Sequence, residues 1–385
     1  MITLVVSGAL ANKPGNAGEA WVRMSWVTGL RRMGFDVWFL EQIAGDLLAD
    51  GQGESKGLES SPHVSYFRDV TRGFGLEGRS ALINEKGGLI VGPDPSELEE
   101  LAREAALLVN ISGHLAVPSL LRRFRRKAYV DLDPGFTQFW QSNGIGARLA
   151  GHDRYFSVGL KVGTPTCLVP ADGIAWIPVP PPVLLEDWPV SHGDPETLST
   201  VASWRGSFGP IEHEGKTYGL KVHEFRKFID LPSHVPQALE IALDIHPADN
   251  RDLEDLRERG WRILDPQEVV PEPDDYRRYI QSSGGEFSVA QGMYVETGSG
   301  WFSDRTVRYL ASGKPALIQD TGFSSMLPSD EGIVAFRTMD EAVAGARRIS
   351  IDYQAHCLAA RQIAEEYFES ERVLSRFLDE ADVAA

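Results

Sequence analysis

The sequence predicts an α/β protein made of two doubly wound, Rossmann-like domains that face each other across a cleft. Three observations predict this class. The 385 residues exceed one ordinary compact domain and suit two. Apolar, strand-like runs alternate with amphipathic, helix-like segments in both halves. A proline-rich stretch, which we assign as a linker over residues 177–192, separates residues 1–176 from residues 193–352.

The first half is predicted to open with one βαβ unit. Residues 2–7 form an apolar run suited to a strand buried on both faces, and residues 8–18 are rich in the Gly, Asn and Pro of a loop. A helix is expected from Glu19 to Gly34, followed by a strand from Asp36. The other predicted elements are strands at 88–91, 107–112, 127–132 and 155–160 and helices at 95–106 and 117–124.

The alternation starts again after the linker. The predicted strands are 199–204, 239–244, 261–264, 286–290 and 316–319, and the predicted helices are 221–228, 252–259, 275–282 and 304–312. A long amphipathic helix is expected from Tyr353, within a closing segment at residues 353–385. Ligands of doubly wound sheets bind at the carboxyl ends of the strands, so the loops that follow the strands are the candidate ligand loops.

Composition and charge exclude several classes of function. A net charge of −17 repels nucleic acid and anionic membranes. The basic run Arg122, Arg123, Arg125, Arg126 and Lys127 is interpreted as a solvated helix end rather than a polyanion site. No segment approaches the length of a membrane span, and the N-terminus lacks the charge and length of a signal peptide. Neither Cys167 nor Cys357 belongs to a disulfide or zinc motif. We therefore expect a cytoplasmic protein without nucleic-acid partners.

A glycine-rich entry into a predicted helix is a candidate phosphate site. Gly298, Ser299 and Gly300 precede Ser303, which is placed to act as the N-cap. Unpaired backbone N–H groups and the positive end of the helix dipole would then meet at one point, as a diphosphate requires. An ordinary capped helix explains Ser303 but not the glycines, so a functional role is favoured.

Residues 300–322 resemble the nucleotide-sugar signature of GT-B fold glycosyltransferases, of the bacterial type. The matching features are a helix ending in a small-residue step, a buried strand from Ala316 and a glycine-containing turn, with Ala311, Gly313, Pro315 and Thr321–Gly322 at the matching positions. The resemblance covers the second half well and the first half loosely. It implies a hexosyltransferase that binds a nucleoside-diphosphate sugar through its second domain, needs no cofactor, and returns its C-terminal helix to the first domain.

One position departs from the family pattern. Retaining members usually carry two glutamates eight residues apart, and the second one, which grips the ribose, would fall at Arg308. Asp304 lies on the same helical face, eight residues after Glu296. Asp304 therefore either contacts the ribose or forms an ion pair with Arg308. Both the stereochemical outcome and the ribose contact stay open.

The resemblance also assigns donor-side residues. Arg205 and Gly206 lie in a loop that would face the sugar phosphates, where a guanidinium stabilises oxygen atoms that gain charge. Lys221 could assist, although a solvated lysine is the favoured interpretation. The remaining candidates for the donor diphosphate or sugar are His246 and the start of the helix at Ser303, Asp304, Arg305 and Thr306.

Acceptor activation is assigned to the first domain. His114 follows a predicted buried strand and is the first candidate for the general base. Asp131 and Asp133 follow the next strand and are the second. Their D-x-D spacing would hold a divalent cation in another glycosyltransferase fold, but here we expect no metal.

The first loop, residues 8–18, lacks the G-x-G-x-x-G order of a dinucleotide site. Its polar candidates for contact with the ligands are Asn12, Asn16 and Glu19, with simple turn chemistry as an equal alternative. Trp21 and Trp26 are expected in the hydrophobic core.

Three functions remain open from the sequence. They are a metal-independent glycosyltransferase acting on an unknown small-molecule or glycan acceptor, a nucleotide-sugar epimerase, and a non-catalytic sugar-nucleotide sensor. A monomer or a homodimer is expected. Release of free nucleoside diphosphate on adding an acceptor would indicate the first function, and sugar interconversion without an acceptor would indicate the second.

Overall fold

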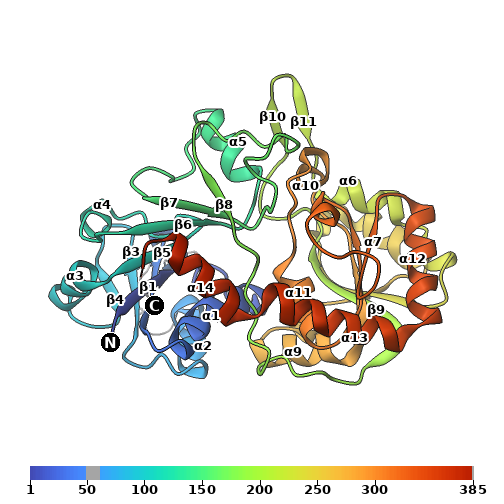
Figure 1. Ribbon diagram of the computed structural model, residues 1–385, viewed down its shortest axis with the longest axis horizontal. Coiled ribbons are helices and arrows are strands. Elements are labelled where there is room, and N and C mark those ends of the chain that lie inside the picture. The colour runs from blue at the N-terminus through green and yellow to red at the C-terminus, as the bar shows by residue number, and fades with distance from the viewer. Residues whose placement is uncertain (49–60, 384–385) are drawn as a thin grey trace.

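The computed structural model describes residues 1–48 and 61–383 and contains two large α/β sheets (Figure 1). The first sheet has eight strands in the order β4-β3-β2-β1-β5-β6-β7-β8, and the second has six in the order β13-β12-β9-β14-β15-β16. Neighbouring strands pair in parallel, except β3 with β4. The predicted class, two doubly wound Rossmann-like domains, is confirmed.

The first half contains the expected βαβ unit and continues outward on both sides of β1. Leu4, Val5 and Val6 are fully buried because β1 lies in the middle of the sheet with helices on both faces. The strands are β1 (Thr3–Ser7), β2 (Asp36–Ile43), β3 (Ser80–Asn84), β4 (Leu89–Val91), β5 (Leu107–Ile111), β6 (Lys127–Asp131), β7 (Arg154–Ser157) and β8 (Trp176–Pro178). The helices are α1 (Ala17–Arg32), η1 (Gly45–Leu48), α2 (Pro62–Gly73), α3 (Pro95–Glu104), α4 (Pro118–Leu121) and α5 (Phe136–Ser142).

The second half repeats the same plan around β9. Its strands are β9 (Asp194–Ser203), β12 (Ala238–Asp244), β13 (Arg262–Leu264), β14 (Ser283–Ser288), β15 (Ala316–Gln319) and β16 (Ile333–Phe336), with a separate hairpin of β10 (Ile211–His213) and β11 (Lys216–Tyr218). The helices are α6 (Lys221–Phe225), η3 (Arg226–Phe228), η4 (Leu231–Ser233), η5 (Pro247–Asp249), α7 (Asn250–Glu258), α8 (Pro266–Val269), α9 (Pro273–Ser282), α10 (Gly292–Thr297), α11 (Asp304–Ala311), η6 (Phe323–Ser325) and α12 (Met339–Ile351).

The strand order reverses direction at one point in each sheet. In the first sheet this switch point lies between β1 and β5, and in the second it lies between β9 and β14. Loops that leave neighbouring strands in opposite directions open a crevice there, which is where open α/β sheets bind ligands. The two switch points define the region in which to look for a site.

The closing segment forms two helices rather than one. α13 (Tyr353–Ile363) continues through a π-helical turn, η7 (Ala364–Phe368), into α14 (Ser370–Glu380). Figure 1 shows these helices, in red, running across both halves of the molecule. α14 packs on α1 of the first half, where the rings of Phe377 and Trp26 lie 4.9 Å apart.

The chain passes between the halves twice, and the two passages are hydrogen-bonded to each other. The backbone N–H of Val183, in the proline-rich stretch, donates to the Phe368 carbonyl at 2.8 Å, and the N–H of Ser370 donates to the Val183 carbonyl at 2.9 Å. The predicted burial of Trp21 and Trp26 is confirmed, since they are 3% and 1% exposed.

Several predicted elements differ from the observed ones. The helix expected at 117–124 is a single turn, α4, so the basic run after it gains little from a helix dipole. The strand expected at 155–160 ends at Ser157. The hairpin at 211–218, together with β3, α2 and α5, was not predicted. No helix in the described ranges is long and apolar enough to cross a membrane.

Candidate active site

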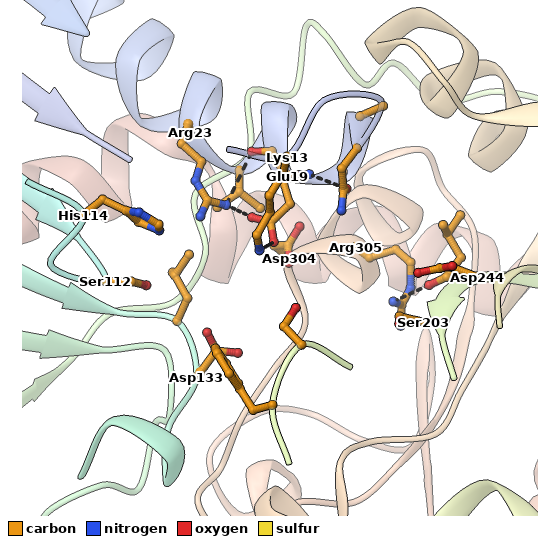
Figure 2. A pocket seen from close by; sticks show the side chains of 18 of the residues that line it. Lys13, Glu19, Arg23, Ser112, His114, Asp133, Ser203, Asp244, Asp304 and Arg305 are labelled. Atoms are coloured by element: carbon orange, nitrogen blue, oxygen red, sulfur yellow. Dashed lines mark hydrogen bonds and ion pairs between the residues drawn. The ribbon is translucent and has the colours of Figure 1, made fainter. Parts of the chain in front are cut away.

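A cavity of about 660 Å³ lies between the two halves, at the carboxyl ends of both sheets (Figure 2). On the first half it is lined by the loops after β1, β5 and β6, and on the second by the ends of β9 and β12 and the start of α11. In Figure 2, His114, Ser112 and Asp133 lie on one side and Arg305, Asp244 and Ser203 on the other, with Arg23, Lys13, Glu19 and Asp304 between them. Both switch points therefore open into one cavity.

A buried carboxylate anchors the loop after β1 through hydrogen bonds. Glu41, on β2, is fully buried and accepts from the backbone N–H groups of Ala11 at 2.7 Å and Asn12 at 3.0 Å. The Asn12 side chain also donates to Glu41, at 2.8 Å. Asn12 is not among the residues that line the cavity. The structure therefore corrects its assignment as a cleft contact: Asn12 anchors the loop.

Three charged side chains of this loop and of α1 form a cluster at the cavity. The Glu19 carboxylate pairs with the Lys13 ammonium at 2.5 Å and also with the Arg23 guanidinium. Burial, and next the nearby Arg23 charge, lower the pKa of Lys13 to about 8. Burial lowers the pKa of Arg23 to about 10. Asn16 caps α1, its side chain accepting from the N–H of Glu19 at 3.2 Å.

Asp131 and Asp133 lie in different environments although one residue separates them. Asp131 is fully buried, and its oxygens accept from Thr137 at 2.7 Å, Gln138 at 2.9 Å, Ser157 at 2.7 Å and the N–H of Asp133 at 3.1 Å. It does not line the cavity. These bonds fix the turn after β6, so the structure replaces the predicted catalytic role of Asp131 with a positioning role.

Asp133 faces the cavity. The Tyr294 hydroxyl, from the second half, donates to it at 3.0 Å. Burial and the neighbouring Asp131 raise the pKa of Asp133, while the Lys13 charge opposes that shift. A carboxylate of raised pKa is a stronger proton acceptor than an ordinary one. No group of three or more His, Cys, Asp or Glu residues in the described parts of the chain is arranged to hold a metal ion.

His114 reaches the cavity through a tight turn after β5. Ser112 and Gly113 have positive φ angles of 52° and 64°, and the buried Asn110 side chain bonds both the N–H and the carbonyl of Leu115. Burial, and next the Arg23 charge, lower the pKa of His114 to about 3. The imidazole is therefore neutral at physiological pH and is a weak proton acceptor.

Arg305 forms part of the opposite wall, and each of its three side-chain nitrogens donates one hydrogen bond. Its guanidinium donates to Glu286 at 2.6 Å, to the Val201 carbonyl at 2.8 Å and to the Ser288 hydroxyl at 2.6 Å. Burial alone would lower the pKa of Arg305, but the Glu286 charge outweighs burial and raises it. A permanently charged group in a fixed position is suited to binding an anion without reorganisation.

The start of α11 has the predicted cap. The Ser303 hydroxyl accepts from the N–H of Arg305 at 3.2 Å. Asp304 forms the ion pair with Arg308 that the sequence left open, and it also lines the cavity. Ser303 and Thr306 are buried and do not line it. Only the first turn of the helix, at Asp304 and Arg305, meets the cavity in the described part of the chain.

The glycines before α11 have a structural explanation. The Gly300 carbonyl accepts from the N–H of Leu160 at 3.2 Å, and the Ser299 carbonyl accepts from the N–H of Lys161 at 3.0 Å. A Cβ atom on Gly300 would lie 2.9 Å from the Lys161 nitrogen. The glycines allow the two halves to approach closely here, which corrects the expectation that they cradle a diphosphate.

The other donor-side candidates lie around the rim. Arg205 pairs with Asp249 through two hydrogen bonds and is half-exposed, and neither Arg205, Gly206 nor His246 lines the cavity. His246 accepts from the N–H of Ala248 at 3.1 Å. Lys221 is half-buried and does not line the cavity. Burial, and next the Arg305 charge, lower the pKa of Lys221 to about 7.

Comparisons with known proteins bear on the fold. No family model and no curated protein matches the sequence. Solved structures do match over nearly the whole chain. HepE of Anabaena in complex with UDP-glucose has a TM-score of 0.63 at 11% identity, covering 99% of this chain and 100% of that chain. The chain has the GT-B fold.

Two further GT-B structures are similar to it. An alpha-glucosyltransferase in complex with UDP and a 13-mer DNA containing an HMU base has a TM-score of 0.60 at 11% identity, with 99% of each chain covered. The pneumococcal O-GlcNAc transferase GtfA in complex with UDP and GlcNAc has a TM-score of 0.54 at 10% identity, covering 99% of this chain and 98% of that chain. At such identities the likeness extends to the GT-B fold alone, and the roles of individual residues rest on this chain's geometry.

Sequence reasoning missed four groups of this GT-B cleft: Lys13, Arg23, Arg148 and Asp244. Lys13 follows a predicted strand in a glycine-rich loop, so its position offered a signal. Arg23 lies on a helix whose neighbours Val22, Met24 and Trp26 are buried, and an arginine on such a face was the second available signal. Arg148 and Asp244 carry no motif that distinguishes them from surface residues.

Proposed function

We propose that this protein is a metal-independent glycosyltransferase that transfers a hexosyl group from a nucleoside-diphosphate sugar to an acceptor hydroxyl. One observation carries the proposal. A single cavity places Asp133, a carboxylate of raised pKa, on one half, opposite the fixed guanidinium of Arg305 on the other half. Proton removal from an acceptor and charge stabilisation on a leaving group are the two tasks of glycosyl transfer, and they fall on opposite walls.

The donor is proposed to bind against the second half. Arg305 and the first turn of α11 would face the diphosphate. Lys221 does not line the cavity itself and would add positive charge from behind, near Arg305. Arg205 and Gly206 form the rim of this wall, where Arg205 is already bonded to Asp249. Asp244, at the end of β12, is placed to accept hydrogen bonds from hydroxyl groups of the donor.

The acceptor is proposed to bind against the first half, with Asp133 as the general base. The Asp133 carboxylate would take the proton from the acceptor hydroxyl as its oxygen forms a bond to the anomeric carbon. The bond from that carbon to the diphosphate oxygen breaks, and the electron pair leaves with the nucleoside diphosphate. Arg305 and Lys221 would stabilise the negative charge that develops there.

His114 is given a different role from the one the sequence favoured. Because its pKa is lowered to about 3, its neutral ring accepts a proton poorly at pH 7. A neutral imidazole still offers one donor and one acceptor, which suits orientation of an acceptor hydroxyl. We therefore place Asp133 ahead of His114 as the base.

The domain boundaries at 1–176, 177–192, 193–352 and 353–385 are part of the proposal. A cytoplasmic location is also part of the proposal. UDP is the first nucleotide to examine because the HepE and GtfA structures contain it.

Calorimetric titration with UDP, GDP and ADP, followed by screening of the corresponding sugar nucleotides with a panel of acceptors, tests the function. The expected result is tight binding of one nucleoside diphosphate and its release from the sugar nucleotide only when an acceptor is present. Sugar interconversion without an acceptor would indicate an epimerase instead. Binding with neither reaction across the panel would favour a sensor.

A further inference from the structure

A second cavity, of about 560 Å³, opens on the first half beside the candidate active site. We call it the basic groove. Three of its lining residues are cations and none is acidic; the lining is Leu115, Ala116, Pro118, Leu121, Arg122, Lys127, Arg148, Ala150 and Gly151. The chain as a whole carries a net charge of −17. A concave surface of opposite sign in such a protein attracts anions that the rest of its surface repels.

Two of the three cations, Arg122 and Arg148, are available to bind an anionic ligand. Arg123 and Lys127, in the same basic run, pair with Glu99 at 2.6 Å and Asp153 at 3.7 Å. Within the described ranges, no carboxylate lies within ion-pair distance of Arg122 or Arg148. Guanidinium groups bind phosphate and carboxylate through paired hydrogen bonds. The guanidinium groups of Arg122 and Arg148 are therefore suited to binding a phosphate or carboxylate group.

The position of Arg148 is held by the fold. Its φ of +55° is uncommon for a residue with a side chain, so neighbouring contacts must maintain it. The residues on both sides are anchored: the Ala147 carbonyl accepts from the Tyr129 hydroxyl at 3.2 Å, and the Leu149 carbonyl accepts from the Tyr155 hydroxyl at 2.9 Å. The side chain of Arg148 thereby leaves the loop at the boundary between the two cavities.

The basic groove is continuous with the acceptor side of the candidate active site. Arg148 lines both cavities, and Leu115 and Ala116 of the groove directly follow His114 of the active site. The non-basic part of the lining is apolar, with Leu115, Pro118 and Leu121. A molecule whose hydroxyl lies at Asp133 can extend past Arg148 into a groove that offers it both cations and apolar contacts.

We propose that the acceptor is a small amphiphilic anion, whose phosphate or carboxylate group binds Arg122 and Arg148 while its apolar part lies on Leu115 and Leu121. The identity of this ligand as the acceptor rests on the proposed function. The groove itself does not, because its chemistry follows from its own lining residues. Amphiphilic anions are therefore the class to screen first as acceptors.

Calorimetric titration with hexyl phosphate, in the presence of saturating UDP, tests the groove while the donor site is filled. Wild-type protein is expected to bind hexyl phosphate at one site and not to bind hexanol. The double variant Arg122→Gln/Arg148→Gln should bind hexyl phosphate at least about tenfold more weakly, because two charge-assisted contacts are lost. The matched control is Arg125→Gln/Arg126→Gln, which also removes two positive charges, at residues of the basic run that do not line the groove.

Equal weakening in both double variants, or no weakening in either, would overturn the groove as a specific site. Failure of hexyl phosphate to bind, together with binding to phosphatidylglycerol vesicles, would overturn a small-molecule occupant and indicate a membrane surface instead. Titration with each of UDP, GDP and ADP alone separates the two proposals. If neither UDP, GDP nor ADP binds, the proposed function fails, while hexyl phosphate titration without nucleotide still decides the groove.

Discussion

The two switch points of the molecule share a topology but differ in how their charged groups are used. At the second, the guanidinium of Arg305 is held by hydrogen bonds to Glu286, Ser288 and the Val201 carbonyl. At the first, Lys13, His114 and Asp133 have pKa values moved by burial and by one another's charges. A wall with fixed charge suits binding of a diphosphate, and a wall with shifted pKa values suits proton transfer. The same sheet plan therefore supports two different tasks.

The comparison is tested most strongly by Asp133→Asn. Loss of the general base should lower kcat by about 10² to 10⁴-fold. The affinity for nucleoside diphosphate should stay nearly constant because that ligand is assigned to the other half. Steady-state kinetics and calorimetry measure the two quantities. Equal losses of turnover and nucleotide affinity would mean that acceptor activation and nucleotide binding are not separated between the two walls.

Arg305→Ala should destabilise the protein by about 3–5 kcal/mol, because the fully buried Glu286 would lose its cation. Chemical denaturation monitored by tryptophan fluorescence measures this change. Arg205→Ala is the matched control, since it breaks a half-exposed arginine–aspartate pair and should leave stability nearly unchanged. Equal stability of both variants would show that Arg305 is not a structural part of its wall.

Asp131→Asn should cost about 1–3 kcal/mol of stability. Each carboxylate oxygen of Asp131 accepts a hydrogen bond from an N–H group: Oδ1 from the backbone of Asp133, and Oδ2 from the side chain of Gln138. In Asp131→Asn, the NH₂ group replaces one of these oxygens, so two hydrogen-bond donors would face each other. Thermal unfolding of Asp131→Asn beside Asp133→Asn measures the difference, and a larger loss of stability in the second variant would reverse the roles assigned to these residues.

Nucleoside-diphosphate binding should weaken as the pH rises through about 7. Lys221 is protonated below its pKa of about 7 and neutral above it, so its attraction for phosphate is present at low pH and lost at high pH. The expected change is about tenfold in Kd between pH 6 and pH 8.5. Lys221→Met should remove this dependence. The same slope in that variant would assign the titration to another group.

His114→Ala should have the smallest effect, a loss of less than about tenfold in kcat. The pKa of about 3 makes the imidazole a poor base, so only its contribution to orienting the acceptor is lost. Between pH 5 and 8, the pH profile of kcat is expected to show no step that disappears in His114→Ala. A loss of 10²-fold or more would restore the sequence-based assignment of His114 as the base.

The fold was predictable because buried strands and amphipathic helices leave periodic patterns. The hairpin at 211–218 was not, since its strands have three residues each and pack on α5 through Phe139 and Tyr218, a contact that no local pattern encodes. Position after a strand located His114 and Asp133, but it also pointed to Arg205 and His246, which do not line the cavity. The roles of the site residues were less accessible: Asp131 and Asp133 look alike in sequence, and only burial and partners separate them.

The paired passages between the halves have a mechanical consequence. Val183 bonds to Phe368 and Ser370, so the joint consists of two adjacent chain segments instead of a single flexible tether. Such a joint permits rotation about an axis through both segments and resists twisting about the perpendicular one. A break in the proline-rich segment would leave the halves joined through the C-terminal helices.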